Sequence, residues 1–346
     1  MLLRLTYITV FLLFFLPVVL RPASSENTAQ SYFEEGIDLN KQRRYDEAIE
    51  KLTGAVTLDL ESNKYHQALF MTYIATRRGP RAIQFYKDLA NEHPKSGVVH
   101  YWLGRLYLES RSLEDAVREF REATRLAPQD EHPFISLGHV YLRLGKNEDA
   151  LKAYLEANKL SPHVAVVHAG LGNIYFGRKE YIKAEKEYDE ALKLDPSLTE
   201  ARYNLSLIYE KKGDFSKAVK EWQALLDADP NESRARERLA QTYFRGGRYA
   251  DAVQEYSTLS QVKQNSPDVF LALGESQIML ASTLTDPDER DQLKKLAAQA
   301  FQQTLELDPG NAQARKYLDR LNSKNLPLDN RDDANRSDAN RNDDKK

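Results

Sequence analysis

Residues 165 to 198 read AVVHAGLGNIYFGRKEYIKAEKEYDEALKLDPSL, and they predict two amphipathic helices joined by a turn. Apolar side chains recur at the three- and four-residue spacing that places them on one face of a helix. They are Leu171, Ile174, Tyr175, Tyr181, Ala184, Tyr188, Ala191 and Leu192. Gly172 and Ala184 are small where the two helices would cross, so the backbones can approach closely. Pro196 closes the unit because proline has no amide hydrogen with which to continue a helix.

Two residue types return at a constant interval along the chain. Alanine stands at positions 48, 82, 116, 150, 184, 218 and 252, and proline stands at 94, 128, 162, 196 and 230. Both series step by 34 residues without a slip, which indicates one helix-turn-helix unit repeated many times. Since each unit contacts only its neighbours, the pattern predicts one elongated core in place of separate globular domains.

A 34-residue helix-turn-helix period with these markers resembles the tetratricopeptide repeat (TPR) family over about 290 of the 346 residues. The small residue of the first helix is Gly36, Gly104, Gly138, Gly172, Ser206, Ala240 and Gly274. The large residue of the second helix is Leu52, Tyr86, Phe120, Tyr154, Tyr188, Trp222, Tyr256 and Phe301. The resemblance implies an all-α fold, a right-handed superhelical solenoid of about eight helix-turn-helix repeats.

The implied repeats span 29–62, 63–96, 97–130, 131–164, 165–198, 199–232, 233–266 and 267–309, followed by a cap helix at 310–322. Phe70 replaces the small residue of the second repeat and predicts a wider helix crossing. Asp286 and Pro287 form a helix start, so the longer eighth repeat should hold a second helix over 287–307. Left-handed residues are expected at Gly145, Gly213 and Gly247. The cap helix should bury Ala312, Ala314, Tyr317, Leu318 and Leu321.

The first 25 residues have the layout of a secretory signal peptide. Arg4 precedes an apolar run that ends at Leu20, and small residues lead to a predicted cleavage after Ser25. An uncleaved anchor is the alternative, since the run of roughly sixteen residues is short for the about 20 of a spanning helix. We expect the solenoid, residues 26–322, to be exported to the periplasm, cell envelope or secretory pathway and not to be cytoplasmic. After cleavage it should not insert into a membrane.

Residues 323–346 predict a disordered low-complexity tail. Apolar periodicity stops there, and asparagine, arginine and aspartate alternate in short motifs such as Asn330-Arg331-Asp332. A segment of such low hydrophobicity cannot bury enough surface to fold.

The composition and the absence of motifs argue against several classes of function. Lys and Arg number 49 against 52 Asp and Glu, without a basic cluster, which argues against a nucleic-acid binder. No cysteine is present, so a thiol nucleophile and a cysteine zinc site are excluded. His132 and His139 share a helix face but lie two turns apart, too far to bind one ion. We predict no enzymatic activity, no cofactor and no metal, and ordinary surface or groove positions for the histidines.

In the TPR family the first helix of each repeat lines a concave groove that binds peptides. By analogy the groove here would present aromatic, amide and basic side chains, which suit an extended or helical peptide. The predicted peptide-binding residues are Tyr101, Arg105, His139, Asn173, Phe176, Tyr203, Asn204, Arg234, Arg238 and Gln241.

Four of these residues match a carboxylate clamp that some family members use to grip the terminal carboxylate of a partner. They are Asn173, Asn204, Arg234 and Arg238. The lysine that completes the clamp in the family is replaced by Ala169. The alternative is that both arginines lie on solvated surface, paired with Glu232 or Glu237.

Together these features predict an exported scaffold or adaptor that binds peptide segments or carboxyl-terminal tails of partner proteins and supports assembly of a complex. The alternative is a substrate-recruiting subunit of an envelope or secretory-pathway enzyme complex, a transferase or a protease.

Overall fold

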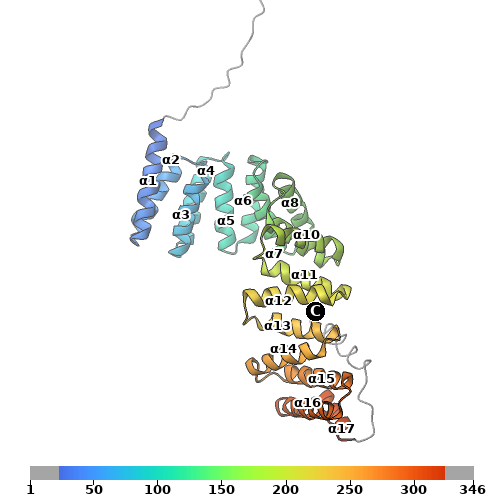
Figure 1. Cartoon of the computed structure of the whole chain (residues 1–346). Coiled ribbons are helices and arrows are strands. Elements are labelled where there is room, and N and C mark those ends of the chain that lie inside the picture. The colour runs from blue at the N-terminus through green and yellow to red at the C-terminus, as the bar shows by residue number, and fades with distance from the viewer. Residues whose placement is uncertain (1–22, 324–346) are drawn as a thin grey trace, which may run out of the picture. The chain divides into compact units, whose positions relative to one another are not determined.

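The structure is a computed structural model that describes residues 23–323. Within that range every regular element is a helix, and seventeen helices follow one another along the chain (Figure 1). They fall into two compact units, Met1–Leu160 and Ser161–Lys346. The fold is an all-α helical repeat solenoid, so the predicted fold class is confirmed.

In unit 1, each odd-numbered helix packs against the even-numbered helix that follows it. The helices are α1 (Ala23–Lys41), α2 (Tyr45–Leu58), α3 (Asn63–Ala75), α4 (Gly79–Glu92), α5 (Gly97–Glu109), α6 (Leu113–Leu126), α7 (Glu131–Arg143) and α8 (Asn147–Leu160).

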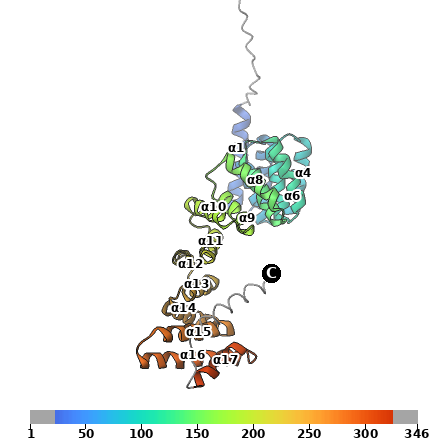
Figure 2. The same ribbon diagram turned by 90° about the vertical axis from the view of Figure 1, so that its right-hand side faces the viewer.

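Unit 2 is built from the same helical hairpins and ends in a single helix (Figure 2). Its helices are α9 (Ala165–Gly177), α10 (Tyr181–Leu194), α11 (Thr199–Lys212), α12 (Phe215–Ala228), α13 (Ser233–Arg245), α14 (Tyr249–Val262), α15 (Pro267–Thr283), α16 (Pro287–Leu307) and α17 (Ala312–Asn322). The predicted helix over 287–307 is confirmed by α16.

Small residues at the crossing of paired helices let an aromatic ring lie directly against the backbone of the first helix. A Cβ added at Gly172 would lie 2.6 Å from Cε1 of Tyr188, and one added at Gly104 would lie 2.7 Å from the Phe120 ring. The alanines of the 34-residue series are fully buried, from Ala48 to Ala252. These two small positions therefore set how closely the helices of a repeat pack.

The second repeat departs from this arrangement as its sequence predicts. Phe70 is buried on α3, and α3 and α4 approach each other less closely than the paired helices of the other repeats. Its ring lies 5.5 Å from the ring of Trp102 on α5. The bulky side chain thus fills space toward the next repeat instead of admitting a ring from its own second helix.

One residue in each turn between the first and second helix of repeats one to seven adopts a left-handed conformation. The prediction is confirmed for the glycines, with φ of 70° at Gly145, 76° at Gly213 and 75° at Gly247. Four repeats place a basic residue at the same position, with φ between 55° and 62°: Arg43, Arg77, Arg111 and Lys179. The turn is therefore common to all seven repeats and does not require glycine.

The last helix packs against α16 and covers the end of the array. Ala314 is buried, and Tyr317, Leu318 and Leu321 are partly buried against Phe301 and its neighbours. The prediction was wrong for Ala312, which is exposed because it lies two residues, about half a turn, before the buried Ala314 and so on the opposite side of α17.

Two predicted segments fall largely outside the described residues. They are residues 1–22 of the signal peptide and residues 324–346 of the tail. Among residues 23–323, no helix has both the length and the apolar character needed to cross a membrane.

Candidate peptide-binding surfaces

In unit 1 the first helices of successive repeats contact one another and form a continuous face, and in unit 2 the first two such helices are in contact. In unit 1 the contacts join α1 to α3, α3 to α5 and α5 to α7, and in unit 2 they join α9 to α11. We call the surface shared by α1, α3, α5 and α7 the first-helix face of unit 1. The first-helix face of unit 2 is the surface shared by α9, α11, α13 and α15. All ten predicted peptide-binding residues belong to these helices.

On the first-helix face of unit 1, Arg105 lies among aromatic rings. Its guanidinium carbon is 4.7 Å from the centre of the Phe70 ring and 4.8 Å from that of Trp102. The ring of Tyr101 packs edge-on against Trp102, with ring centres 5.4 Å apart. Burial raises the pKa of the Tyr101 hydroxyl, and the nearby charge of Arg105 opposes this shift. His139, on α7, the next first helix, is exposed.

On the first-helix face of unit 2, the two predicted clamp asparagines bind each other. The Asn204 amide donates to Oδ1 of Asn173 at 3.0 Å and to the Tyr188 hydroxyl at 3.1 Å. The Tyr188 hydroxyl donates to the same Oδ1 of Asn173 at 2.6 Å. This partly buried network joins α9, α10 and α11, and burial raises the pKa of Tyr188 well above its usual range.

Arg238, the third clamp candidate, is paired with a buried carboxylate. Its Nη2 donates to Oε2 of Glu210 at 2.5 Å, and the Glu210 side chain is only 2% exposed. Oε1 of Glu210 accepts hydrogen bonds from the Trp222 indole at 2.9 Å and from the Thr242 hydroxyl at 2.8 Å. Nη1 of Arg238 also donates to Gln241, at 2.9 Å. Arg238 is therefore partly buried, and its ion pair is with Glu210 and not with Glu232 or Glu237.

Arg234 is the exposed member of the four clamp candidates. Its guanidinium lies 5.1 Å from the centre of the Tyr203 ring, and Nη2 donates to the Tyr203 hydroxyl at 3.3 Å. The Tyr203 ring packs edge-on against Trp222, with ring centres 4.8 Å apart. Phe176 packs against Tyr181 in the same unit, at 5.8 Å. All four candidates thus bind groups of this chain, and Arg234 is the one among them that is exposed.

The comparison with known families agrees with the repeat geometry. Tetratricopeptide repeat profiles match residues 73–134 and 203–267, and a TPR repeat profile matches 138–178 and 172–213. Together the matches cover more than half of the chain. The chain is a tetratricopeptide repeat protein. No enzyme family is among these matches, and no curated protein matches the sequence.

Solved structures share the fold of this TPR protein at low sequence identity. The carboxyl-terminal part of a TPR repeat-containing protein from Cytophaga hutchinsonii is 18% identical, with a TM-score of 0.56, over 74% of this chain and 98% of that one. YrrB, described as a TPR protein with an unusual peptide-binding site, is 18% identical, with a TM-score of 0.50, over 57% of this chain and 96% of that one. These likenesses support the fold.

The TPR protein uses one position of the first helix in a way that the sequence interpretation missed. The position is filled by His66, His100, His168, Arg202 and Arg236, all in the 34-residue register. We call this position the latch position. His168 bonds the carbonyl of Pro162 at 2.9 Å and the carboxylate of Glu187 at 2.7 Å. Arg236 makes the equivalent bonds to Pro230 at 2.9 Å and Glu255 at 2.7 Å.

The latch position corrects the prediction of ordinary surface or groove histidines for His66, His100 and His168, whereas His132, His139 and His163 are exposed. His66 is fully buried between the Leu60 carbonyl and the Tyr86 hydroxyl, and this burial lowers its pKa to about 4. His100 pairs with Glu119 at 2.8 Å, and this hydrogen bond raises its pKa. The 34-residue spacing of these histidines was the signal that could have revealed their shared structural role.

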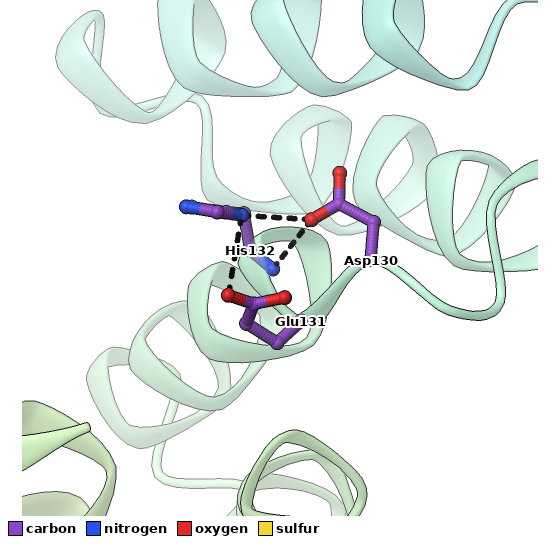
Figure 3. A group of neighbouring side chains, drawn as sticks. All are labelled: Asp130, Glu131 and His132. Carbon is purple, nitrogen blue, oxygen red and sulfur yellow. Dashed lines mark hydrogen bonds and ion pairs between the residues drawn. The ribbon is translucent and has the colours of Figure 1, made fainter. Parts of the chain in front are cut away.

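Asp130, Glu131 and His132 bring three potential metal ligands within 4.8 Å of one another (Figure 3). Asp130 is the residue that caps α7, because its Oδ1 accepts a hydrogen bond from the His132 backbone N–H at 3.0 Å. Nδ1 of His132 lies 2.7 Å from the same oxygen and 3.8 Å from Glu131. A hydrogen bond from Nδ1 uses the atom that a metal would need, so helix capping accounts for the cluster.

Proposed function

We propose that this TPR protein is an exported scaffold that binds peptide segments of partner proteins on its first-helix faces and supports the assembly of a protein complex. The supporting observation is arginine packed over aromatic rings on both faces, Arg105 in unit 1 and Arg234 in unit 2. Aromatic rings and arginine are the groups that contribute most to protein interfaces.

The TPR fold supports protein partners, and the peptide-binding site named for YrrB is consistent with a peptide ligand on the same kind of fold. Export is supported by the sequence alone, through Arg4, the apolar run and the small residues before Glu26. Amino-terminal sequencing of protein from its native host should start at Glu26. Soluble cytoplasmic protein that retains Met1 would contradict export.

Photo-crosslinking tests the proposed binding surface directly. A photoreactive phenylalanine replaces Tyr101 in one variant and Tyr203 in another, each in the native envelope fraction. Equivalent probes at Arg125 and Lys193, exposed on the second helices α6 and α10, are the controls. We expect partners to crosslink at the first two positions only. Equal crosslinking at all four would contradict the surface, whereas recovery of a transferase or protease would favour a recruiting subunit.

A further inference from the structure

The Arg105 cluster consists of Phe70, Met71, Tyr101, Trp102 and Arg105, on α3 and α5 of unit 1. It forms where the second repeat departs from the pattern, because Phe70 replaces a small residue and reaches toward α5. The Trp102 ring is held in place by a hydrogen bond from its indole N–H to Oδ1 of Asn63, at 3.0 Å. Departures from a repeat pattern without a local structural need are expected at functional sites.

Arg105 differs from the arginines that stabilise the repeats. Arg202 and Arg236 lie against glutamates of their own repeats, and Arg238 is paired with the buried Glu210. Among residues 23–323, Arg105 forms no ion pair with a carboxylate, although it is partly buried against the rings. Its orientation is fixed by the aromatic faces and the Tyr101 hydroxyl, so it is ready to bind an anion without first leaving a partner.

An exposed apolar residue lies in the same repeat register as Arg105. Met71 follows Phe70 on α3, one repeat earlier, and its side chain is 57% exposed. Methionine is flexible and polarisable, so it can pack against apolar side chains of different shapes. The cluster therefore combines a fixed cation with an adaptable apolar neighbour.

We propose that the Arg105 cluster recognises an acidic side chain inside a peptide segment, with an apolar side chain of the same segment packing on Met71. This proposal rests on the proposed peptide-binding function and specifies its ligand in unit 1. The planar guanidinium can donate two parallel hydrogen bonds to one carboxylate. An internal residue fits best because α3 and α7 flank α5 on the same face, so a bound chain continues past Arg105 on both sides.

The test starts from random peptides of about 12 residues, a length that spans several first helices, displayed on phage and selected on the full chain. Affinities of the selected peptides are then measured by fluorescence polarisation. Changing the Asp or Glu of a selected peptide to its amide should weaken binding about tenfold or more, since it removes a charge-assisted bidentate contact. Arg105→Met should cause a similar loss, and the two changes together should cost little more than either alone.

Two variants control for folding and for general charge. Arg125→Met removes an exposed cation of α6 that pairs with Glu122, and should leave affinity unchanged. Met71→Ser alters an exposed side chain and should weaken peptides with an apolar residue beside the acid, with an unchanged circular dichroism melt. Arg105→Lys keeps the charge without the planar fork and should bind with intermediate affinity.

The outcomes separate this proposal from the proposed function. Selection of no peptide would contradict peptide binding by the whole chain. Selected peptides that need no acid, or that bind Arg105→Met as tightly as the parent, would overturn the Arg105 assignment and leave the scaffold function standing. Binding that is lost on amidation of the peptide terminus, but not on changing its internal acid, would also overturn it.

Discussion

Removal of the Glu210 side chain should lower the stability of unit 2 around α11, α12 and α13. Its buried carboxylate accepts hydrogen bonds from Trp222, Thr242 and Arg238, which lie on α12 and α13, so it joins two repeats. In Glu210→Ala the indole N–H and the hydroxyl lose this acceptor in a site closed to water. Arg238 is left as an unpaired cation, although its side chain is 25% exposed and gains some hydration.

The expected loss follows from these three hydrogen bonds and from a fourth contact, between Nη1 of Arg245 and Oε2 of Glu210 at 3.5 Å. Breaking a buried ion pair by removing one partner costs about 3 to 5 kcal/mol, and the partial exposure of Arg238 places the estimate at the lower end. Glu210→Gln keeps one acceptor oxygen and the side-chain volume but loses the charge, so a loss of about 1.5 to 3 kcal/mol is expected.

Hydrogen exchange followed by mass spectrometry measures the effect region by region, which suits an array whose repeats need not unfold together. Exchange in α11, α12 and α13 should accelerate roughly a hundredfold or more in Glu210→Ala, whereas unit 1 should be unchanged. Glu190→Ala, which removes an exposed pair with Lys193, is the matched control and should cost less than about 1 kcal/mol. Equal effects of the two substitutions would refute the buried junction.

Three further predictions concern the turns, the crossings and the buried histidine. Lys179→Gly should raise the free energy of unfolding in urea by about 0.5 to 1 kcal/mol, because it removes a side chain from a left-handed backbone position at some cost in chain entropy. Gly213→Lys should lower the free energy of unfolding by a similar amount. Gly172→Ala should cost about 1 to 3 kcal/mol, whereas Gly177→Ala, with no atom within 4 Å of its new Cβ, should not destabilise. The pKa of His66 is about 4 in the folded state against an ordinary 6.5. Its contribution to the free energy of unfolding is therefore complete above pH 6.5 and is lost as the pH falls toward 4. His66→Gln should remove that part of the pH dependence of the urea midpoint, and a parent midpoint that is flat across this range would contradict it.

Most of the fold could be predicted from the 34-residue repeat period. A constant step of small and aromatic residues is enough to place two helices per repeat and to choose their buried faces, and the buried alanines from Ala48 to Ala252 follow it. Local capping chemistry at Asp286 located the start of α16, where the side chain accepts from the Asp288 backbone N–H at 2.8 Å. Phe70 predicted a wider helix crossing in the second repeat because one bulky side chain breaks an otherwise regular series of small residues.

The hydrogen-bond partners could not be read in the same way. A repeat register gives the face on which Asn173, Asn204 and Arg238 lie, but not which groups of neighbouring helices reach them. Glu210 lies on α11, and its hydrogen-bond partners are contributed by α12 and α13. Whether the ten surface residues bind a peptide stays a prediction, and the structure adds that Asn173, Asn204 and Arg238 already have partners in this chain.

The left-handed turns bear on how such a chain can change its length. Gly213 and Arg111 give the same backbone path although one has no side chain and the other a long one. The path is therefore set by the helices on both sides of the turn. Among the regular repeats, deletion or duplication of a 34-residue block joins equivalent backbone and keeps a large side chain opposite each small residue, whereas any other length would bring unlike positions together. Whole regular repeats can thus be added or removed while the turns between the remaining helices keep their geometry.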